Sequence, residues 1–266
     1  MKINKYWVDE TVDIPMHGRV QKTRIVAGSR VSAEAAVVAW HDMHRLICSR
    51  INGGGKAKSE EYESDIYEHI ADEIDGSNIV TINRYGALVL NTTEYSIYDL
   101  DGHGVDWGDF TFRYWGMSRK QKIVAKFKRL VGAIADIGTD FRIYETHKGI
   151  RVIGRRYFDT KSANFHAVGR RLCVDGLYLM MCMRQHCYRA RLTPKPYRMK
   201  ARTIRIRKPA DCLSDAYLEW AREYRAMAEK HATVRLIECI GRDFSHDAVI
   251  RYHDCMTNCQ SGLPLA

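Results

Sequence analysis

The stretch TDFRIYETHKGIRVIGRR, residues 139–156, is the segment of this chain that decides the fold. Its two arms are rich in β-branched and aromatic residues that alternate with polar ones, which is the pattern of paired strands. Between the arms lie His147, Lys148 and Gly149, a short loop that contains the glycine favoured by tight turns. The stretch therefore predicts an antiparallel β-hairpin.

The hairpin stands among strand-like and helix-like stretches. NIVTINRYG (78–86), ALVLN (87–91) and YSIYDLD (95–101) indicate a meander of short strands before it. Apolar residues at helical spacing and capping residues predict helices over 32–51, 59–75, 118–138, 214–232 and 246–259, and further strands are predicted over 203–208 and 233–241. This order indicates an α+β protein with a central, mostly antiparallel sheet flanked by helices.

The length and composition are those of a globular protein with a large core. The chain has 266 residues, of which 45% are hydrophobic and 28% are charged. We expect three parts: an N-terminal, mostly helical region over 1–76, an α+β core of catalytic type over 77–210, and a C-terminal helix–strand–helix subdomain over 211–266 that packs on the core.

The sequence predicts a cytoplasmic protein without a membrane partner. Its longest apolar run, LYLMMCM (177–183), is too short to cross a bilayer, and MKINKYWVDE at the start lacks the apolar core of a signal peptide. The eight cysteines are therefore expected to be free thiols or metal ligands rather than disulfides.

The positive charge is concentrated in two tracts. The chain has 42 Lys and Arg against 32 Asp and Glu, a net charge of +10. Residues 184–208 contain ten basic residues and no acid, and residues 119–129 form a second acid-free basic run. These tracts could be solvated faces, but Tyr188 and Tyr197 lie within the first, and arginine mixed with aromatic residues suits phosphates and bases. We therefore expect nucleic acid or a nucleotide as the partner.

A pair of acids ends one of the predicted strands. Asp99 and Asp101 in YDLD lie two residues apart, so their side chains share one face of the strand. Carboxylate oxygens are the ligands that Mg²⁺ and Mn²⁺ prefer, and phosphoryl transfer on nucleotides uses such ions. The alternative is that the two acids cap a loop turn made by Gly102 and Gly104.

Three stretches, in this order along the chain, carry a resemblance to a known family. They are YDLD, the hairpin segment ETHKGIRVI, and VDGLYLMMCM, which is followed by the basic RLTPKP. Their order resembles the catalytic core of archaeo-eukaryotic-type primases and primase-polymerases, over about residues 85–200. The resemblance implies an RRM-like core, a metal-dependent nucleotidyltransferase acting on DNA or RNA with a nucleoside triphosphate, and a Mg²⁺ or Mn²⁺ site made by Asp99, Asp101 and Asp175.

The resemblance also implies which residues contact the ligands. Gly149-Ile150 matches the glycine-hydrophobic step of the family hairpin, and Arg151 stands where the family has its nucleotide-binding histidine. An arginine can hold a triphosphate through two parallel hydrogen bonds but cannot accept a proton. We expect nucleotide contacts from His147, Lys148 and Arg151, and nucleic-acid contacts from Arg189, Arg191, Lys195 and Arg198.

Several other functions fit parts of the sequence. With a histidine missing, the same fold could bind nucleic acid or a nucleotide without chemistry, and the same acids could serve a metal-dependent nuclease or phosphatase. DLDG also resembles the opening motif of haloacid-dehalogenase-like phosphatases, with His103 in place of the usual threonine. A C-terminal cluster of possible Zn²⁺ ligands has irregular spacing, so we expect buried thiols and surface histidines there rather than zinc: Cys239, His246, His253, Cys255 and Cys259.

The sequence therefore predicts metal-dependent nucleotidyl transfer, primase-polymerase-like, in replication, repair or the biology of a phage or other mobile element.

Overall fold

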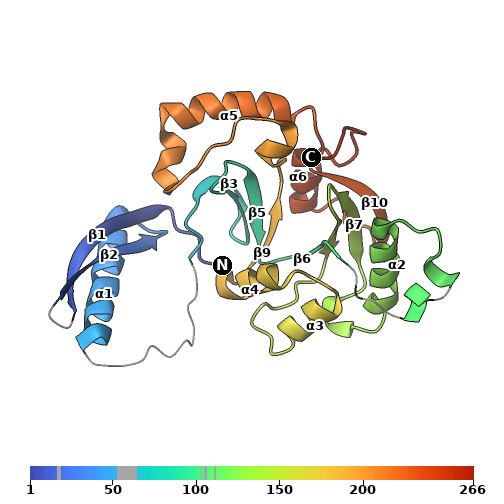
Figure 1. The fold of residues 1–266 in the computed structure, drawn as a ribbon, viewed down its shortest axis with the longest axis horizontal. Coiled ribbons are helices and arrows are strands. Elements are labelled where there is room, and N and C mark those ends of the chain that lie inside the picture. Colours follow the sequence, from blue (N-terminus) through green and yellow to red (C-terminus); the bar gives the residue numbers. More distant parts are fainter. Residues whose placement is uncertain (17–18, 53–64, 103, 105–106, 111) are drawn as a thin grey trace.

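The computed structural model describes residues 1–266 apart from 17–18, 53–64, 103, 105–106 and 111. In these residues the strands form three mostly antiparallel sheets, one of two strands and two of four strands, with six α-helices around them (Figure 1). The predicted α+β class is confirmed. The strands are divided among three sheets, however, where the sequence predicted one central sheet.

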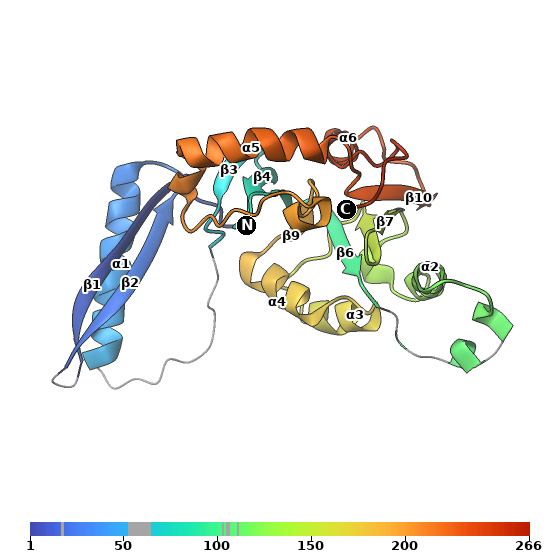
Figure 2. The ribbon, with the colours of Figure 1, turned by 45° about the horizontal axis from the view of Figure 1, so that its top comes forward.

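The N-terminal unit is a hairpin with one helix on it. Strands β1 (Tyr6–Met16) and β2 (Arg19–Ser29) pair along their whole length, and α1 (Ala33–Asn52) packs on one face. A small core of Ile14, Ile25, Ala27 and Trp40 joins them. Figures 1 and 2 show this unit at one end of the molecule. The helix predicted over 32–51 is confirmed, but the strands make the region less helical than expected.

The first four-stranded sheet has the order β3-β4-β5-β9. Its strands are β3 (His69–Asp75), β4 (Asn78–Ile82), β5 (Leu88–Thr92) and β9 (Tyr188–Arg191). The helix predicted over 59–75 is wrong for the β3 residues, and its first residues lie outside the described part. The composition of this acidic stretch favours a helix, but pairing of β3 with β4 outweighs that weak local preference.

The second four-stranded sheet has the order β10-β7-β8-β6. Its strands are β6 (Ser96–Leu100), β7 (Phe141–Thr146), β8 (Ile150–Gly154) and β10 (Val234–Ile240). The predicted hairpin is confirmed as β7 and β8, whose pairing runs from Phe141↔Gly154 to Glu145↔Ile150. Gly149 in its turn lies against the end of β6: a Cβ there would be 2.3 Å from the carbonyl oxygen of Leu100.

Five more helices cover these sheets. They are α2 (Arg119–Val131), α3 (Phe165–Arg171), α4 (Gly176–Gln185), α5 (Asp215–Ala228) and α6 (Ala248–Met256). Helices α3 and α4 lie on the opposite side of the sheets from α5 (Figure 2). The predicted strand over 203–208 is wrong: this segment is irregular.

The two four-stranded sheets share the main hydrophobic core. Val80 and Leu90 of the first sheet belong to the same buried cluster as Ile97, Ile143 and Val152 of the second. Strands β6 and β9, each at an edge of its sheet, are in contact where the sheets meet. This junction positions the side chains of the site described below.

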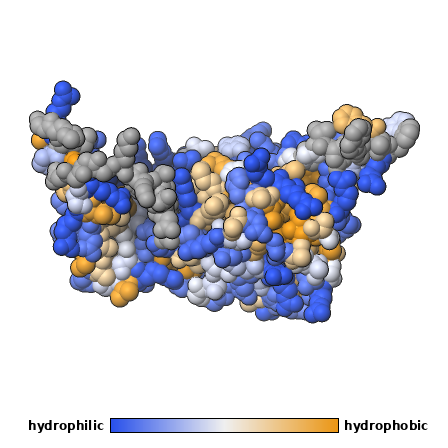
Figure 3. Space-filling model, turned by 90° about the horizontal axis from the view of Figure 1, so that it is seen from below, coloured by the Kyte–Doolittle hydropathy of each residue, from blue (hydrophilic) through white to orange (hydrophobic). Residues whose placement is uncertain are grey.

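The surface is mostly hydrophilic, with separate apolar patches. Seen from below, these patches are divided by hydrophilic residues (Figure 3). Large exposed apolar side chains lie on α1 and α4, namely Val37, Val38, Met43 and Leu46, and Leu177, Met180 and Met183. Among the described helices, none combines the length and the apolar character needed to cross a membrane.

Candidate functional site

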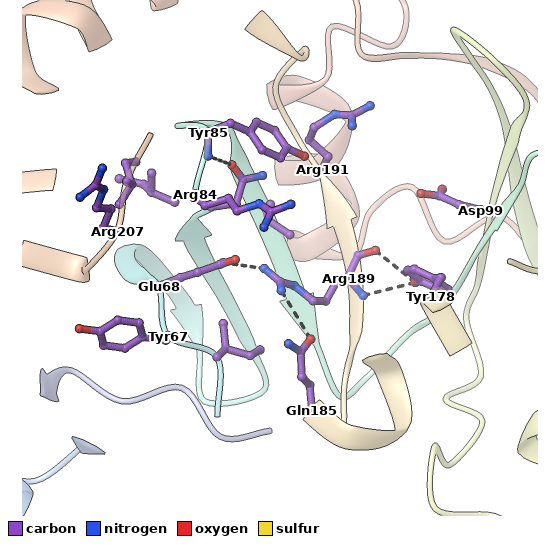
Figure 4. Close-up of a pocket in the computed structure, with 15 residues that line it drawn as sticks. Tyr67, Glu68, Arg84, Tyr85, Asp99, Tyr178, Gln185, Arg189, Arg191 and Arg207 are labelled. Carbon is purple, nitrogen blue, oxygen red and sulfur yellow. Dashed lines mark hydrogen bonds and ion pairs between the residues drawn. The ribbon is translucent and has the colours of Figure 1, made fainter. Parts of the chain in front are cut away.

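A cavity of about 440 Å³ lies where the first sheet meets β6, α4 and the segment before α5. Four arginines line it: Arg84, Arg189, Arg191 and Arg207 (Figure 4). Three tyrosines also line it: Tyr67, Tyr85 and Tyr178. The acids on its wall are Glu68 and Asp99. The cavity thus combines aromatic rings with an excess of positive charge.

A rigid turn between β4 and β5 presents Arg84 and Tyr85. The side-chain oxygen of Asn83 accepts hydrogen bonds from the backbone N–H groups of Tyr85 and Ala87, both at 3.1 Å. Gly86 has φ +84°, and a Cβ there would lie 2.2 Å from the ring of Trp220. The local sequence NRYGA therefore fixes the backbone and leaves the Arg84 side chain exposed.

Arg189 is held by an acid inside the cavity. Its Nη2 lies 2.5 Å from Oε2 of Glu68, and Nη1 lies 3.5 Å from the side-chain oxygen of Gln185 (Figure 4). The hydroxyl of Thr81 donates to the same Glu68 oxygen at 2.6 Å. Burial alone would lower the pKa of Arg189, but Glu68 outweighs it and the pKa is raised. The charge of Arg189 is therefore already compensated.

The other three arginines of the cavity have no acidic partner among the described residues. Arg84 and Arg207 are exposed, and Arg191 is half-buried. The Nε of Arg191 is buried, and no described residue provides it with a hydrogen-bond partner. An unpaired, partly desolvated guanidinium is costly unless a ligand satisfies it. These three side chains therefore form the part of the cavity best suited to an anion.

Asp99, on the wall of the cavity, is paired with the buried Arg151. Strands β6 and β8 place the two residues directly opposite each other. Arg151 donates from Nε to one carboxylate oxygen at 2.9 Å and from Nη2 to the other at 3.3 Å. Burial alone would lower the pKa of Arg151, but Asp99 outweighs it and the pKa is raised. This is a two-bond pair of the kind that arginine forms best.

Arg151 also joins the two sheets. Its Nη1 donates to the backbone carbonyl oxygen of Arg191 at 2.8 Å, on the free edge of β9. Its side chain is only 2% exposed and has three hydrogen bonds within the protein. The prediction that Arg151 contacts a nucleotide phosphate is not supported by this geometry. The arginine has a structural position behind the cavity wall.

Asp175 acts at the start of α4. Its carboxylate accepts a hydrogen bond from the backbone N–H of Tyr178 at 2.9 Å, which is an N-cap. The cap orients Tyr178, whose hydroxyl oxygen lies 2.9 Å from the carbonyl oxygen of Ile97 and 3.1 Å from that of Arg189, so its single hydrogen is shared between β6 and β9. Asp175 thus supports the Tyr178 contacts, which link β6 to β9 in addition to the hydrogen bond from Arg151 to Arg191.

Asp99, Asp101 and Asp175 do not form a metal site in the described structure. Throughout the described residues there is no group of three or more His, Cys, Asp or Glu side chains that could hold a metal ion. Asp99 is committed to Arg151 and Asp175 to the α4 cap, while the side chain of Asp101 is exposed. The prediction that these three acids converge on Mg²⁺ or Mn²⁺ is therefore not supported by their geometry.

The predicted basic residues divide into two groups. Arg189 and Arg191 line the cavity. Lys195 and Arg198 lie instead around the exposed ring of Tyr197, with Nζ and Cζ each 5.9 Å from the ring centroid. The two groups are close in sequence, but Lys195 and Arg198 are not among the residues that line the cavity.

The β7–β8 turn carries the two remaining predicted nucleotide contacts. His147 and Lys148 are exposed there, and Nδ1 of His147 lies 3.1 Å from the carbonyl oxygen of Leu265. Slight burial would raise the pKa of Tyr197, but Arg198, Lys195 and Lys148 together lower it. The charge of Lys148 therefore acts on Tyr197, and neither His147 nor Lys148 is among the residues that line the cavity.

A second buried arginine lies in the region of the possible zinc ligands. Arg142 donates to the hydroxyl of Tyr144 at 2.8 Å and to Asp254 at 2.6 Å, and Nδ1 of His253 lies 2.9 Å from Asp254. Cys239 lies 3.4 Å from Arg142. All eight cysteines are free thiols. His253 is fully buried in a hydrogen-bond network with an acid and an arginine, so the expectation of a surface histidine is wrong for it, and Cys239 and Cys255 are exposed where buried thiols were expected.

The sequence did not single out several cavity residues. The sequence predicts Arg84 and Tyr85 only as the end of a strand, and Tyr67 and Glu68 only as part of a helix. An asparagine and a glycine flanking Arg84-Tyr85 between two apolar runs is a turn signal that could have identified the first pair. No comparable local pattern marks Glu68, which reaches Arg189 across the sheet.

No protein-family model, curated protein or solved structure matches this chain. The functional conclusion therefore depends on the cavity and on the charged surface around it.

Proposed function

We propose that this protein binds the phosphates of a nucleic acid or a nucleotide in the arginine- and tyrosine-lined cavity. The observation that carries the proposal is the set Arg84, Arg191 and Arg207, which line one cavity and have no acidic partner in the described structure. Guanidinium groups bind phosphate oxygens through paired hydrogen bonds, and nearby aromatic rings accept bases by stacking.

The geometry favours binding without nucleotidyl transfer. The primase-polymerase resemblance would require Asp99, Asp101 and Asp175 to hold a divalent ion for the reaction. Asp99 instead offers both carboxylate oxygens to Arg151, and Asp175 caps α4. Nucleotidyl transfer, with its Mg²⁺ or Mn²⁺, remains a prediction from the motif order, as does the RRM-like core, and so do the nuclease and phosphatase alternatives.

A binding assay with a matched pair of variants tests the proposal. Fluorescence anisotropy is recorded for a labelled oligonucleotide and for a labelled nucleoside triphosphate, over a range of salt concentrations. We expect salt-sensitive binding, and in Arg191→Gln about tenfold weaker binding with a salt slope that is smaller by about 1. Arg222→Gln, an exposed arginine on α5 outside the cavity, removes the same charge and serves as the control.

Two outcomes would overturn the proposal. One is that neither ligand binds at low salt. The other is that Arg191→Gln and Arg222→Gln weaken binding equally, which would show a nonspecific effect of net charge. In a separate reaction with Mn²⁺, nucleotides and a primed or unprimed template, extension or primer synthesis would favour nucleotidyl transfer over binding alone, and degradation of the strand would favour a nuclease.

A further inference from the structure

The ring of Tyr197 forms a second, separate place where a base could bind. Tyr197 lies in a short 3₁₀ helix, Pro196–Met199, and 58% of the residue is exposed. Nζ of Lys195 and Cζ of Arg198 each lie over its ring, 5.9 Å from the ring centroid. An exposed aromatic ring among cations is the combination that binds an unpaired base together with its phosphates.

A basic segment connects Tyr197 with the cavity. Between them the chain runs through Lys200, Arg202 and Arg205 to Arg207, and these four side chains are exposed. No acid pairs with any of the four in the described part of the chain. Four exposed cations without an acidic partner in the described structure therefore lie along the chain between Tyr197 and the wall of the cavity.

The backbone of this segment is fixed at several points. Trp220 donates from its ring nitrogen to the carbonyl oxygen of Arg202 at 2.7 Å, and the N–H of Ile206 donates to the carbonyl oxygen of Arg84 at 2.8 Å. Ile206 is buried, and Ile204 packs against the same core. Because Ile204 and Ile206 pack against the core, the side chains of Arg205 and Arg207, which alternate with them, are exposed to solvent.

We propose that the ligand is a single-stranded nucleic acid, bound from the cavity along residues 200–207 to Tyr197, on which one base stacks. The inference rests on the proposed function and deepens it by choosing an extended strand over a mononucleotide. A duplex would keep its bases stacked within the helix, so it would not use the tyrosine ring in this way.

The test combines ligand length with Tyr197 variants. Anisotropy is measured with labelled oligothymidylates and oligouridylates of about 4 to about 16 nucleotides, the range of known single-strand site sizes, and with a duplex of the longest length. We expect affinity to rise with length and the duplex to bind more weakly. Tyr197→Ala is expected to lose about tenfold in affinity for the longest strand, and Tyr197→Phe, which keeps the ring, less than twofold.

The outcomes separate this inference from the proposed function. If the wild-type protein binds none of the strands but binds the labelled nucleoside triphosphate, only the inference fails; if it binds neither kind of ligand, both fail. If strands bind and Arg191→Gln weakens them, but Tyr197→Ala binds the longest strand as the wild type does, only the inference fails. Equal affinity for the duplex, or equal losses in Tyr197→Ala and Tyr197→Phe, would also overturn it. Because Tyr197 is exposed, both variants are expected to melt at the wild-type temperature, which is recorded as the control for folding.

Discussion

The arginines of the two four-stranded sheets differ in what neutralises them. In the second sheet, Arg142 and Arg151 are each 2% exposed, and each is bound by an acid. Around the first sheet, Arg84, Arg191 and Arg207 line a cavity with no acid to pair with them in the described structure. Arg189 of the first sheet is neutralised by Glu68, as the buried arginines of the second sheet are by their acids, but Arg84, Arg191 and Arg207 keep an open binding capacity.

The difference follows from the cost of burying charge. A fully buried guanidinium must be compensated within the protein, because the loss of its hydration is otherwise larger than any packing gain. A guanidinium at a cavity wall keeps part of its hydration and can exchange it for a ligand. The identity of the partner, rather than the number of arginines, distinguishes the two kinds of site.

The largest expected effect is that of removing the acid from the Asp99–Arg151 pair. Asp99→Ala leaves the buried guanidinium of Arg151 uncompensated, so we expect the free energy of unfolding to fall by about 3–5 kcal/mol. Urea denaturation measures the loss. If Asp99 were instead a free metal ligand, its removal would relieve repulsion from Asp101 and leave the stability unchanged or higher.

The matched control is the neighbouring acid. Asp101 is exposed, and its carboxylate has no partner in the described structure, so Asp101→Ala should change the free energy of unfolding by less than about 0.5 kcal/mol. Equal and small effects of the two substitutions would show that the pairing of Asp99 with Arg151 does not stabilise the fold, and the comparison between the two sheets would lose its basis.

The buried network around Arg142 predicts a pH dependence of stability. Burial lowers the pKa of His253 below 6.5, and the charges of Arg151 and Arg142 lower it further, against the opposing effect of Asp254. The unfolded chain therefore binds a proton more readily than the folded one. The stabilisation is complete above about pH 6.5 and is lost as the pH falls toward the folded pKa, at about 1.4 kcal/mol per unit of difference.

Chemical denaturation at several pH values measures this effect. His253→Gln, which cannot titrate, should flatten the dependence of the free energy of unfolding on pH below about 6.5. His246→Gln removes an exposed histidine and should leave the slope as it is in the wild type. An unchanged slope in His253→Gln would show that the titrating group lies elsewhere.

The parts of the fold with strong local patterns were predictable from sequence. The β7–β8 hairpin has alternating arms around a glycine turn, and α5 has a serine cap followed by an amphipathic run. β3 was not predictable in this way, because its acidic sequence favours a helix and only pairing with β4 makes it a strand. The irregular segment 203–208 resembled a strand because Ile204 and Ile206 alternate with arginines, but they pack against the core around Trp220.

The sequence could predict the basic composition of the site, but not which arginines would be paired with acids. The tract over 184–208 indicated a polyanion partner, and Arg189 and Arg191 from it line the cavity. The sequence could not show that Arg151 would face Asp99, because that contact depends on the register between β6 and β8, which are far apart in the chain. A carboxylate pair on a strand therefore indicates a metal only when no buried arginine faces it.

For the cavity arginines we expect the opposite of the Asp99→Ala result, a loss of ligand affinity without a loss of stability. Arg191→Gln should leave the free energy of unfolding unchanged or slightly higher, because the side chain has no acid to lose and its buried Nε has no partner in the described structure, while its oligonucleotide affinity falls about tenfold. Both quantities are measured on one preparation, by denaturation and by anisotropy. A loss of stability comparable to that of Asp99→Ala would place Arg191 with the structural arginines.

The smallest expected effect concerns Asp175 and distinguishes its cap from a metal ligand. Asp175→Ala removes the N-cap of α4 and should lower the free energy of unfolding by about 1 kcal/mol, whereas Asp175→Asn should cost only a few tenths, since asparagine caps helices as well as aspartate does. A capping role depends on the hydrogen bond to Tyr178, but a metal ligand depends on the negative charge, which both variants remove. If Mn²⁺ stabilises the wild type against heat and both variants lose this effect equally, the carboxylate acts as a metal ligand. If only Asp175→Ala is less stable and Mn²⁺ has no effect on the melting of any of the three proteins, Asp175 acts as a helix cap. Its role is then structural, like that of Asp99 beside Arg151.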